Sequence, residues 1–282
     1  MSVLEFAPTW ALPLAALFGL LIGSFLNVVI HRLPRMMQME WEREARDLLD
    51  QPEETQPARY DLWSPRSQCP QCDRPIRAYE NIPVLSFLLL RGHCPGCGGR
   101  ISWQYPAVEL LTAALFALTI LHFGAGAAGL AALGLTAVLI AAAGIDARTT
   151  LLPDQLTLPL LWLGLVANYF GLFTDLESAV LGAIGGYLSL WLVYHAFRLT
   201  TGKEGMGYGD FKLLAALGAW LGWQALPMVL LLASLVGAIV GITLILLRGR
   251  DRNIPIPFGP YLAAAGWLVL LWGDQLITVY LP

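Results

Sequence analysis

The sequence predicts an all-α polytopic membrane protein with about eight transmembrane helices. Of its 282 residues, 57% are hydrophobic and only 13% are charged, and its mean hydropathy is +0.62. Soluble domains contain roughly 25% charged residues, so this composition excludes the soluble class. The apolar residues gather in stretches of about 20 residues, the length that a helix needs to cross the hydrocarbon core of a bilayer.

Eight apolar segments account for the predicted helices. They lie near residues 12–30, 105–123, 127–145, 156–173, 179–197, 211–223, 226–247 and 258–273. The first segment lacks the basic stretch that precedes a cleavable signal sequence, so we expect it to be a retained span. The fifth contains Gly182, Gly185 and Gly186, residues that allow close helix packing in lipid. The sixth is short, so we expect that the sixth and seventh do not both cross the bilayer fully.

The basic residues are confined to four of the predicted loops. Residues 31–104 hold ten of the 17 Lys and Arg residues, and the others lie in 146–155, 198–212 and 248–256. With eight spans these loops share one side of the membrane, which the positive-inside rule assigns to the cytoplasm. The sequence therefore predicts that both termini lie on the opposite side.

Three parts follow from this arrangement. They are the first transmembrane helix within residues 1–30, a cytoplasmic loop domain at 31–104, and a polytopic core at 105–282. Within the loop domain, the stretch from Met36 to Leu49 predicts a polar helix at the membrane surface. Proline and polar residues at 51–57 predict a loose connector. No internal repeat is evident.

Four cysteines in the loop domain form two Cys-x-x-Cys pairs. They are Cys69, Cys72, Cys94 and Cys97. The spacing favours four thiolates converging on one Zn²⁺, over the alternatives of two disulfides or two redox motifs, because a reducing cytoplasm disfavours disulfides. A site with four thiolate ligands has no open coordination position. We therefore expect a structural zinc that folds a loop too small to form its own core.

Two aspartates lie where apolar segments meet loops on the same predicted side of the membrane. Asp146 ends the third segment and Asp210 begins the sixth. An ionised Asp can take a proton from water while a protonated Asp polarises a peptide carbonyl, so the two form a candidate aspartic-protease pair. A helix N-terminus favours a carboxylate anion and a C-terminus disfavours it, which predicts Asp210 as the base and Asp146 as the acid. The two can exchange roles, because a coupled pair titrates as a unit. The alternative is that both are helix caps or solvated side chains.

Other polar residues in or beside the apolar segments are weaker candidates. Asp154 follows Pro153 and suits the first turn of a helix. Glu109 is an acid within a span that could bind an amine or pair with a polar group. His122 and His195 are isolated on apolar helices, which is typical of interfacial or core positions. Because the acids cluster at one boundary, a transporter or assembly scaffold, whose sites usually lie at the bilayer midplane, is disfavoured.

The motifs together resemble those of one enzyme family. The chain contains, in order, Gly23-Ser-Phe-Leu-Asn-Val-Val-Ile-His-Arg-Leu-Pro34, the two cysteine pairs, Asp146 with Leu-Leu-Pro-Asp154, and Gly205-Met-Gly-Tyr-Gly-Asp-Phe-Lys212. This combination is similar to that of the type IV prepilin leader peptidases, also called type II secretion prepilin peptidases, which are aspartic membrane proteases of the Gly-x-Gly-Asp type. By motif position, Asp146 and Asp210 match the catalytic pair of the family, and the four cysteines match its zinc site.

The resemblance implies a bifunctional enzyme of the bacterial inner membrane. Such an enzyme cleaves the basic leader of prepilins and pseudopilins after a glycine, on the cytoplasmic side. It then methylates the new amino terminus, usually of Phe, with S-adenosylmethionine. We expect prepilin and pseudopilin substrates, contact with membrane lipid, periplasmic termini and no nucleic-acid partner. The near alternative is a peptidase without the second activity. The sequence has no Gly-x-Gly-x-x-Gly nucleotide motif, which leaves the 31–104 loop as the place for a methyl-donor site.

Overall fold

The computed structural model describes residues 10–51, 59–203, 205–248 and 256–277 of the chain. The connector predicted at 51–57, Arg250, Arg252 and both chain ends fall mostly or wholly outside this part. In the described residues all regular structure is helical apart from two isolated β-bridges. This finding confirms the predicted all-α class.

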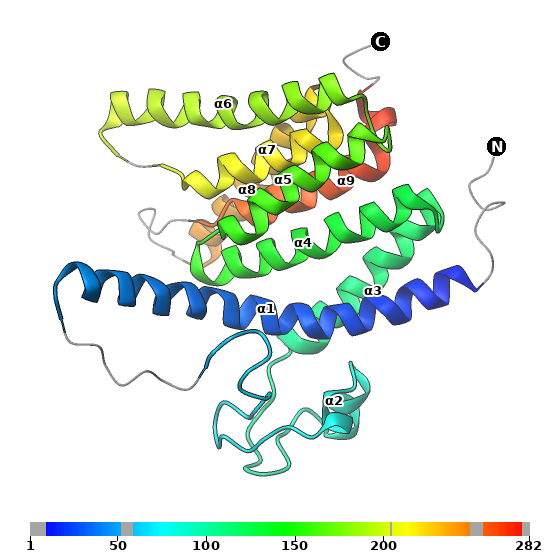
Figure 1. Cartoon of the computed structure of the whole chain (residues 1–282), viewed down its shortest axis with the longest axis vertical. Coiled ribbons are helices and arrows are strands. Elements are labelled where there is room, and N and C mark those ends of the chain that lie inside the picture. Colours follow the sequence, from blue (N-terminus) through cyan, green and yellow to red (C-terminus); the bar gives the residue numbers. More distant parts are fainter. Residues whose placement is uncertain (1–9, 52–58, 204, 249–255, 278–282) are drawn as a thin grey trace. The chain divides into compact units, whose positions relative to one another are not determined.

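The chain divides into two compact units, Ser2–Leu121 and His122–Pro282 (Figure 1). The amino-terminal unit contains α1 (Ala11–Leu48), η2 (Ala78–Asn81), α2 (Leu85–Leu89) and most of α3 (Gln104–Phe123). The carboxy-terminal unit contains α4 (Ala127–Thr149), α5 (Asp154–Tyr169), α6 (Leu176–Thr201), α7 (Tyr208–Leu221), η3 (Trp223–Ala225), α8 (Leu226–Arg248) and α9 (Gly259–Ile277). The three-part division predicted above remains a prediction.

Each of the eight predicted apolar segments forms a helix, but the helices differ in length. Among the described residues, five apolar stretches are long enough to cross a membrane: α1, α3, α4, α6, and η3 together with α8. The α7 helix has 14 residues and is therefore about 21 Å long, less than the roughly 30 Å hydrocarbon core. This agrees with the prediction that the sixth segment is short. The count of eight full spans is not confirmed.

The first helix continues well beyond its predicted end at residue 30. The α1 helix runs without interruption from Ala11 to Leu48 and includes Pro34 in its interior. The predicted polar helix from Met36 to Leu49 is therefore the continuation of the first span, not a separate element. Its Met, Gln, Glu, Arg and Leu residues have high helix propensity, and extending an existing helix avoids the unfavourable nucleation step.

Within the amino-terminal unit, α1 and α3 cross at closely packed backbones. A Cβ atom at Gly23 would lie 2.7 Å from the Cα of Glu109, so only glycine fits there. One turn further along α1, the buried Asn27 side chain donates hydrogen bonds to Tyr105 O at 3.0 Å and to Gly23 O at 3.2 Å. These two bonds pair the amide N–H groups of Asn27, whereas its Oδ1 is buried and has no partner among the described residues.

The α7 helix is the centre of the carboxy-terminal unit. It packs against α5, α6 and α9, and every residue from Phe211 to Trp220 is buried except Lys212. At its carboxyl end, the Asn168 amide of α5 donates to Ala219 O at 2.8 Å and to Trp220 O at 3.0 Å. These bonds satisfy carbonyls that a helix end leaves unpaired. Because α7 is enclosed by other helices, its first turn is held in a fixed position.

Close contact between α6 and α7 depends on small residues, which leads to a first prediction. A Cβ at Gly182 of α6 would overlap the backbone of Gly218 on α7, whereas one at Gly185 would meet only Leu226 Cδ1 at 3.6 Å. We expect Gly182→Ala to destabilise the protein by about 1–3 kcal/mol, because α6 must move away from α7. Gly185→Ala on the same helix is the matched control. Thermal unfolding in detergent measures both, and an equal melting temperature for the two variants would contradict this packing.

Candidate functional site

Asp146 lies at the carboxyl end of α4, one turn before the helix stops. Its side chain is only 4% exposed. The helix ends when Thr150 adopts a left-handed conformation with φ of 55° and donates its N–H to Asp146 O at 2.9 Å. The carboxyl group therefore points from a rigid helix end into the packed interior of the unit.

Asp210 lies in the first turn of α7 and is 7% exposed. Its position depends on the glycine before it. A Cβ at Gly209 would lie 2.5 Å from the Cβ of Leu152 in the loop between α4 and α5, so a larger residue would push the start of α7 away. The rings of Tyr208 and Phe211 also pack on Tyr194 of α6. The helix start is thus fixed from two sides.

Leu152 and the start of α9 connect the two aspartates. The backbone N–H of Gly259 donates to Asp146 Oδ2 at 2.8 Å, and a Cβ at Gly259 would lie 3.1 Å from Leu152 Cδ1. Leu152 therefore touches the backbone beside both aspartates. Asp146 and Asp210 are thus both held by backbone that packs on the same leucine side chain. The structure brings together the two residues that the sequence predicts as a pair.

The carboxyl pair is incompletely hydrogen-bonded. Asp210 Oδ1 is buried and has no partner among the described residues. A buried carboxylate without a donor is unfavourable, and two nearby carboxyls do not readily carry two charges. An arrangement in which the pair shares one proton removes both difficulties. Gly259, whose N–H reaches Asp146, was not predicted from the sequence; the Pro-Phe-Gly-Pro turn before the last span was the signal available.

The other polar candidates lie elsewhere. The Asp154 carboxylate accepts two bonds from Lys212 Nζ, at 2.6 and 2.7 Å, and its side chain is 51% exposed. This ion pair ties the start of α5 to α7. Glu109 belongs to the amino-terminal unit, where its Oε2 accepts the Val84 N–H at 2.8 Å. Neither His122 nor His195 belongs to a cluster of potential metal ligands within the described chain.

A cavity of about 480 Å³ lies beside the residues that hold the carboxyl pair. It is bounded by α6, α8 and the chain leading into α9. Its walls are almost entirely apolar or small: Ser189, Leu190, Val193, Met206, Leu230, Ser234, Gly237, Ala238, Ile256, Pro257, Phe258 and Tyr261. Met206 belongs to the glycine-rich loop before Asp210, and Phe258 precedes Gly259. Two segments that line the cavity therefore lead directly to Asp210 and to Gly259, which binds Asp146.

The four cysteines form one cluster in the loop of the amino-terminal unit. All four are free thiols, their sulfur atoms lie within 4.8 Å of one another, and Cys69 Sγ is 4.0 Å from Cys97 Sγ. Four sulfurs bound tetrahedrally at 2.3 Å from a Zn²⁺ ion would be about 3.8 Å apart. The cluster thus has the size of a metal site, and the four cysteines can bind a metal ion.

The two cysteine pairs have the same local fold, repeated after 25 residues. In the first, Cys69 N donates to Arg74 O and Asp73 has a φ of 53°; in the second, Cys94 N donates to Gly99 O and Gly98 has a φ of 71°. Isolated bridges also match: Gln68 with Pro75, and His93 with Arg100. No internal repeat is evident in the sequence, but the structure contains this short one.

The thiols differ in their ability to ionise. Backbone N–H groups of Cys97 and Gly96 lower the pKa of Cys94 to about 6. Although the N–H of Arg74 lowers the pKa of Cys72, lost hydration and the neighbouring thiols raise it to about 11. Four thiolates so close together repel one another, and a bound cation relieves this repulsion. The chemistry of the cluster therefore also favours a metal.

Two family models match ranges of the chain that include these residues. The Bacterial Peptidase A24 N-terminal domain matches residues 17–123, and the Type IV leader peptidase family matches residues 133–242. The cysteine cluster lies in the first match and the aspartate pair in the second.

Several relatives named prepilin leader peptidase/N-methyltransferase align with nearly the whole chain. The relative from Aeromonas salmonicida (strain A449) is 61% identical over 95% of this chain and 93% of its own length. Those from Pseudomonas aeruginosa and Xanthomonas campestris pv. campestris are 57% and 50% identical, covering 94% and 100% of this chain and 91% and 98% of their own. No solved structure matches. The chain therefore belongs to the type IV leader peptidase family.

Proposed function

We propose that the protein cleaves the leader peptide from prepilins and pseudopilins and then methylates the nitrogen of the new amino terminus. The observation that carries the peptidase activity is the buried pair of Asp146 and Asp210, which α4 and α7 bring together. The names of the relatives support both activities. The aspartates act as the catalytic pair, and the family match, which includes both of them, supports that assignment.

Peptide hydrolysis by this pair requires one carboxylate and one carboxylic acid. The carboxylate takes a proton from water, which attacks the scissile carbonyl, and the acid donates a hydrogen bond to the carbonyl oxygen. The Gly259 N–H favours negative charge on Asp146, and the unpartnered Oδ1 favours the proton on Asp210. These contacts favour Asp146 as the base, the reverse of the assignment from helix ends. As the C–N bond breaks, the proton that Asp146 took from water passes to the leaving amine.

The enzyme works in the bacterial inner membrane, with its active site facing the cytoplasm and both termini in the periplasm. The five span-length helices support a membrane location. The confinement of all 17 Lys and Arg residues to alternate loops supports this orientation. A pair at the cytoplasmic boundary would meet the junction between the basic leader of a prepilin and its membrane-embedded segment.

The metal in the cysteine cluster is Zn²⁺, held by Cys69, Cys72, Cys94 and Cys97. The matched pairs and the sulfur spacing support this assignment. Four thiolates fill a tetrahedral zinc, so the ion has no position left for water or substrate. Its role is to link two short loops that have no apolar core.

The methyl donor is S-adenosylmethionine, which supplies an electrophilic methyl group on a sulfonium sulfur. The protein must bind this cofactor and hold the new amino terminus, in its unprotonated form, against that methyl group. The printed name N-methyltransferase of the relatives supports this second activity.

The apolar cavity between α6 and α8 holds the membrane-embedded segment of the substrate next to the scissile bond. Met206 and Phe258 line the cavity and lie close in sequence to Asp210 and Gly259, which supports this placement. Ala238→Trp should fill the cavity and lower kcat/KM for prepilin by about tenfold or more, mainly through KM. Val236→Trp, an exposed residue of α8 outside the cavity, is the matched control.

Steady-state cleavage of a full-length prepilin by both tryptophan variants makes this test. A normal KM for Ala238→Trp would mean that lipid, rather than substrate, fills the cavity. Equal losses in both variants would reflect general damage to α8.

The whole proposal is tested with the purified full chain, a prepilin and S-adenosylmethionine carrying a labelled methyl group. Mass spectrometry should show a shortened product with one methyl group on its terminal nitrogen. A shortened product without label would mean that the protein is a peptidase without methyltransferase activity. An intact substrate would contradict the proposed function.

A further inference from the structure

A second cavity, of about 390 Å³, is lined only by residues of the amino-terminal unit. One wall is a single face of α1, formed by Leu21, Ser24, Phe25, Val28 and Arg32, which recur at helical spacing. The other walls are residues 62–67, without Ser64, together with Asn81 and Pro83. Its volume lies in the range of about 300–1,000 Å³ that small-molecule sites occupy. The function proposed above assigns no role to this cavity.

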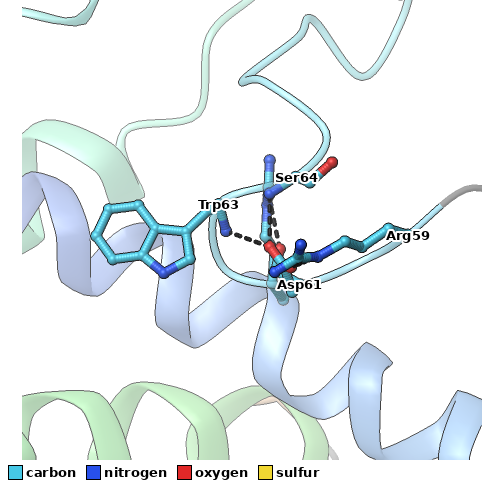
Figure 2. Close-up of polar contacts among 5 residues, drawn as sticks. Arg59, Asp61, Trp63 and Ser64 are labelled. Atoms are coloured by element: carbon cyan, nitrogen blue, oxygen red, sulfur yellow. Dashed lines mark hydrogen bonds and ion pairs between the residues drawn. The ribbon is translucent and has the colours of Figure 1, made fainter.

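The loop wall of the cavity is fixed by polar contacts. Arg32 donates from Nη1 to Asp61 O at 2.8 Å and from Nη2 to Pro65 O at 2.6 Å, which ties the loop to α1. The N–H groups of Ser64 and Trp63 donate to Asp61 Oδ1 at 2.7 Å (Figure 2). These N–H groups and the Arg59 guanidinium hold the pKa of Asp61 below its usual value, so the turn keeps its charge at neutral pH.

The groups facing the cavity are of three chemical kinds. The ring of Trp63, which points away from the Asp61 carboxylate in Figure 2, stacks beside Phe25 at 5.9 Å between centroids and 30° between planes. Arg66 supplies an exposed guanidinium that is in no ion pair within the described chain. Leu21 and Val28 are apolar. A ligand that suits this set has a flat ring or a soft cation for the aromatics and a carboxylate for the arginine.

We propose that this cavity is the S-adenosylmethionine site, an inference that rests on the proposed methyl transfer. The cofactor has an adenine ring, a sulfonium cation and an amino-acid carboxylate, which match the three kinds of group. Phe25 and Trp63 take the adenine or sulfonium end, and Arg66 takes the carboxylate. In the transfer, the lone pair of the unprotonated amine forms the N–CH₃ bond while the S–CH₃ bond breaks. The electron pair of the broken S–CH₃ bond stays on sulfur, and the methylated ammonium loses a proton to water.

Two elements behind the cavity position its walls. The carboxylate of Glu109 accepts hydrogen bonds from the Val84 N–H and from the hydroxyl of Ser24, which lines the cavity. On the other side, Ser67 lines the cavity and its carbonyl accepts the Ile76 N–H at 2.8 Å, next to the first cysteine pair. The loop that carries the first cysteine pair is thus joined directly to one wall of the cofactor site.

Binding of tritiated S-adenosylmethionine to the full chain in detergent tests the site. Trp63→Ala and Arg66→Ala should each raise Kd at least about tenfold, as expected when an aromatic stacking partner or a charged hydrogen bond is lost. Trp103→Ala and Arg100→Ala are matched controls, because Trp103 is 74% exposed where Trp63 is 79%, and neither control lines the cavity. Both controls should bind as the wild type does. Metal content and melting temperature establish that each variant is folded.

A photoreactive S-adenosylmethionine analogue provides a second measurement that needs no variant. Labelled peptides should come from residues 21–32 or 59–83. Labelling elsewhere, or unchanged Kd in both cavity variants of a wild-type protein that methylates its substrate, would overturn this site and leave the proposed function intact. A wild-type protein that cleaves prepilin but neither binds the cofactor nor methylates would overturn both the site and the methyl transfer.

Discussion

Asp146→Asn and Asp210→Asn should each lower the rate of prepilin cleavage at least about a thousandfold, because general acid–base catalysis by a positioned side chain contributes roughly 10²–10⁴. Asn has nearly the shape of Asp, but it can neither take a proton from water nor donate one to the leaving amine. The effect should appear in kcat more than in KM, since both carboxyls act on the reacting bond. Purified variants and a full-length prepilin give these constants.

Asp154→Asn is the matched control for that experiment. Asp154 begins α5, shortly after Asp146 in the sequence, and is paired with Lys212, but it is half-exposed. Its ion pair with Lys212 is of the kind that contributes about 0–1 kcal/mol to stability. We therefore expect its cleavage rate to stay within a few-fold of the wild type. A loss as large as that of Asp210→Asn would mean that Asp154 belongs to the catalytic group.

Removal of the metal should unfold the cysteine loop and leave the helices intact. Structural zinc sites in small peptides bind with an apparent free energy of about 10–16 kcal/mol, which here replaces an apolar core. We expect about one zinc per chain, lost in Cys69→Ser and in Cys94→Ser. Both cysteines are buried, so no ligand from solvent takes their place.

Limited proteolysis and metal analysis test this prediction about metal removal. Without metal, the segment from residue 59 to 104 should be cleaved rapidly, whereas α4–α9 should resist. Ser86→Ala, in the same loop but outside the cluster, should keep both its metal and its resistance. A metal-free chain with a protease-resistant loop would contradict the structural role.

The sequence predicted the features that have strong local signals. Two matched Cys-x-x-Cys pairs and an aspartate at each of two helix ends indicate six candidate site residues. The structure clusters the four cysteines and buries both aspartates, and the roles of the six residues stay predictions. Hydropathy likewise located the eight helices of 14 residues or more in the described part of the chain. It misplaced the end of α1, because the residues after Pro34 form a polar helix that hydropathy alone separates from the span before it.

The remaining features depend on contacts that are distant in sequence. Gly259 donates to Asp146 across 113 residues, and its Pro-Phe-Gly-Pro turn does not by itself indicate that partner. The cofactor cavity likewise requires Arg32 of α1 to bind a loop 29 and 33 residues away. Which aspartate acts as the acid and which as the base also depends on these contacts. A single backbone N–H at Asp146 favours its negative charge, which opposes the effect of the helix ends.

The central claim is that Asp146 and Asp210 act as one proton-sharing unit. The double variant Asp146→Asn/Asp210→Asn tests it most directly, in a cleavage assay beside the two single variants. Residues that act as a unit lose their effect together, so the double variant should be about as slow as either single one. If the two losses multiply, or if either single variant keeps the full cleavage rate, the aspartates do not form one catalytic pair.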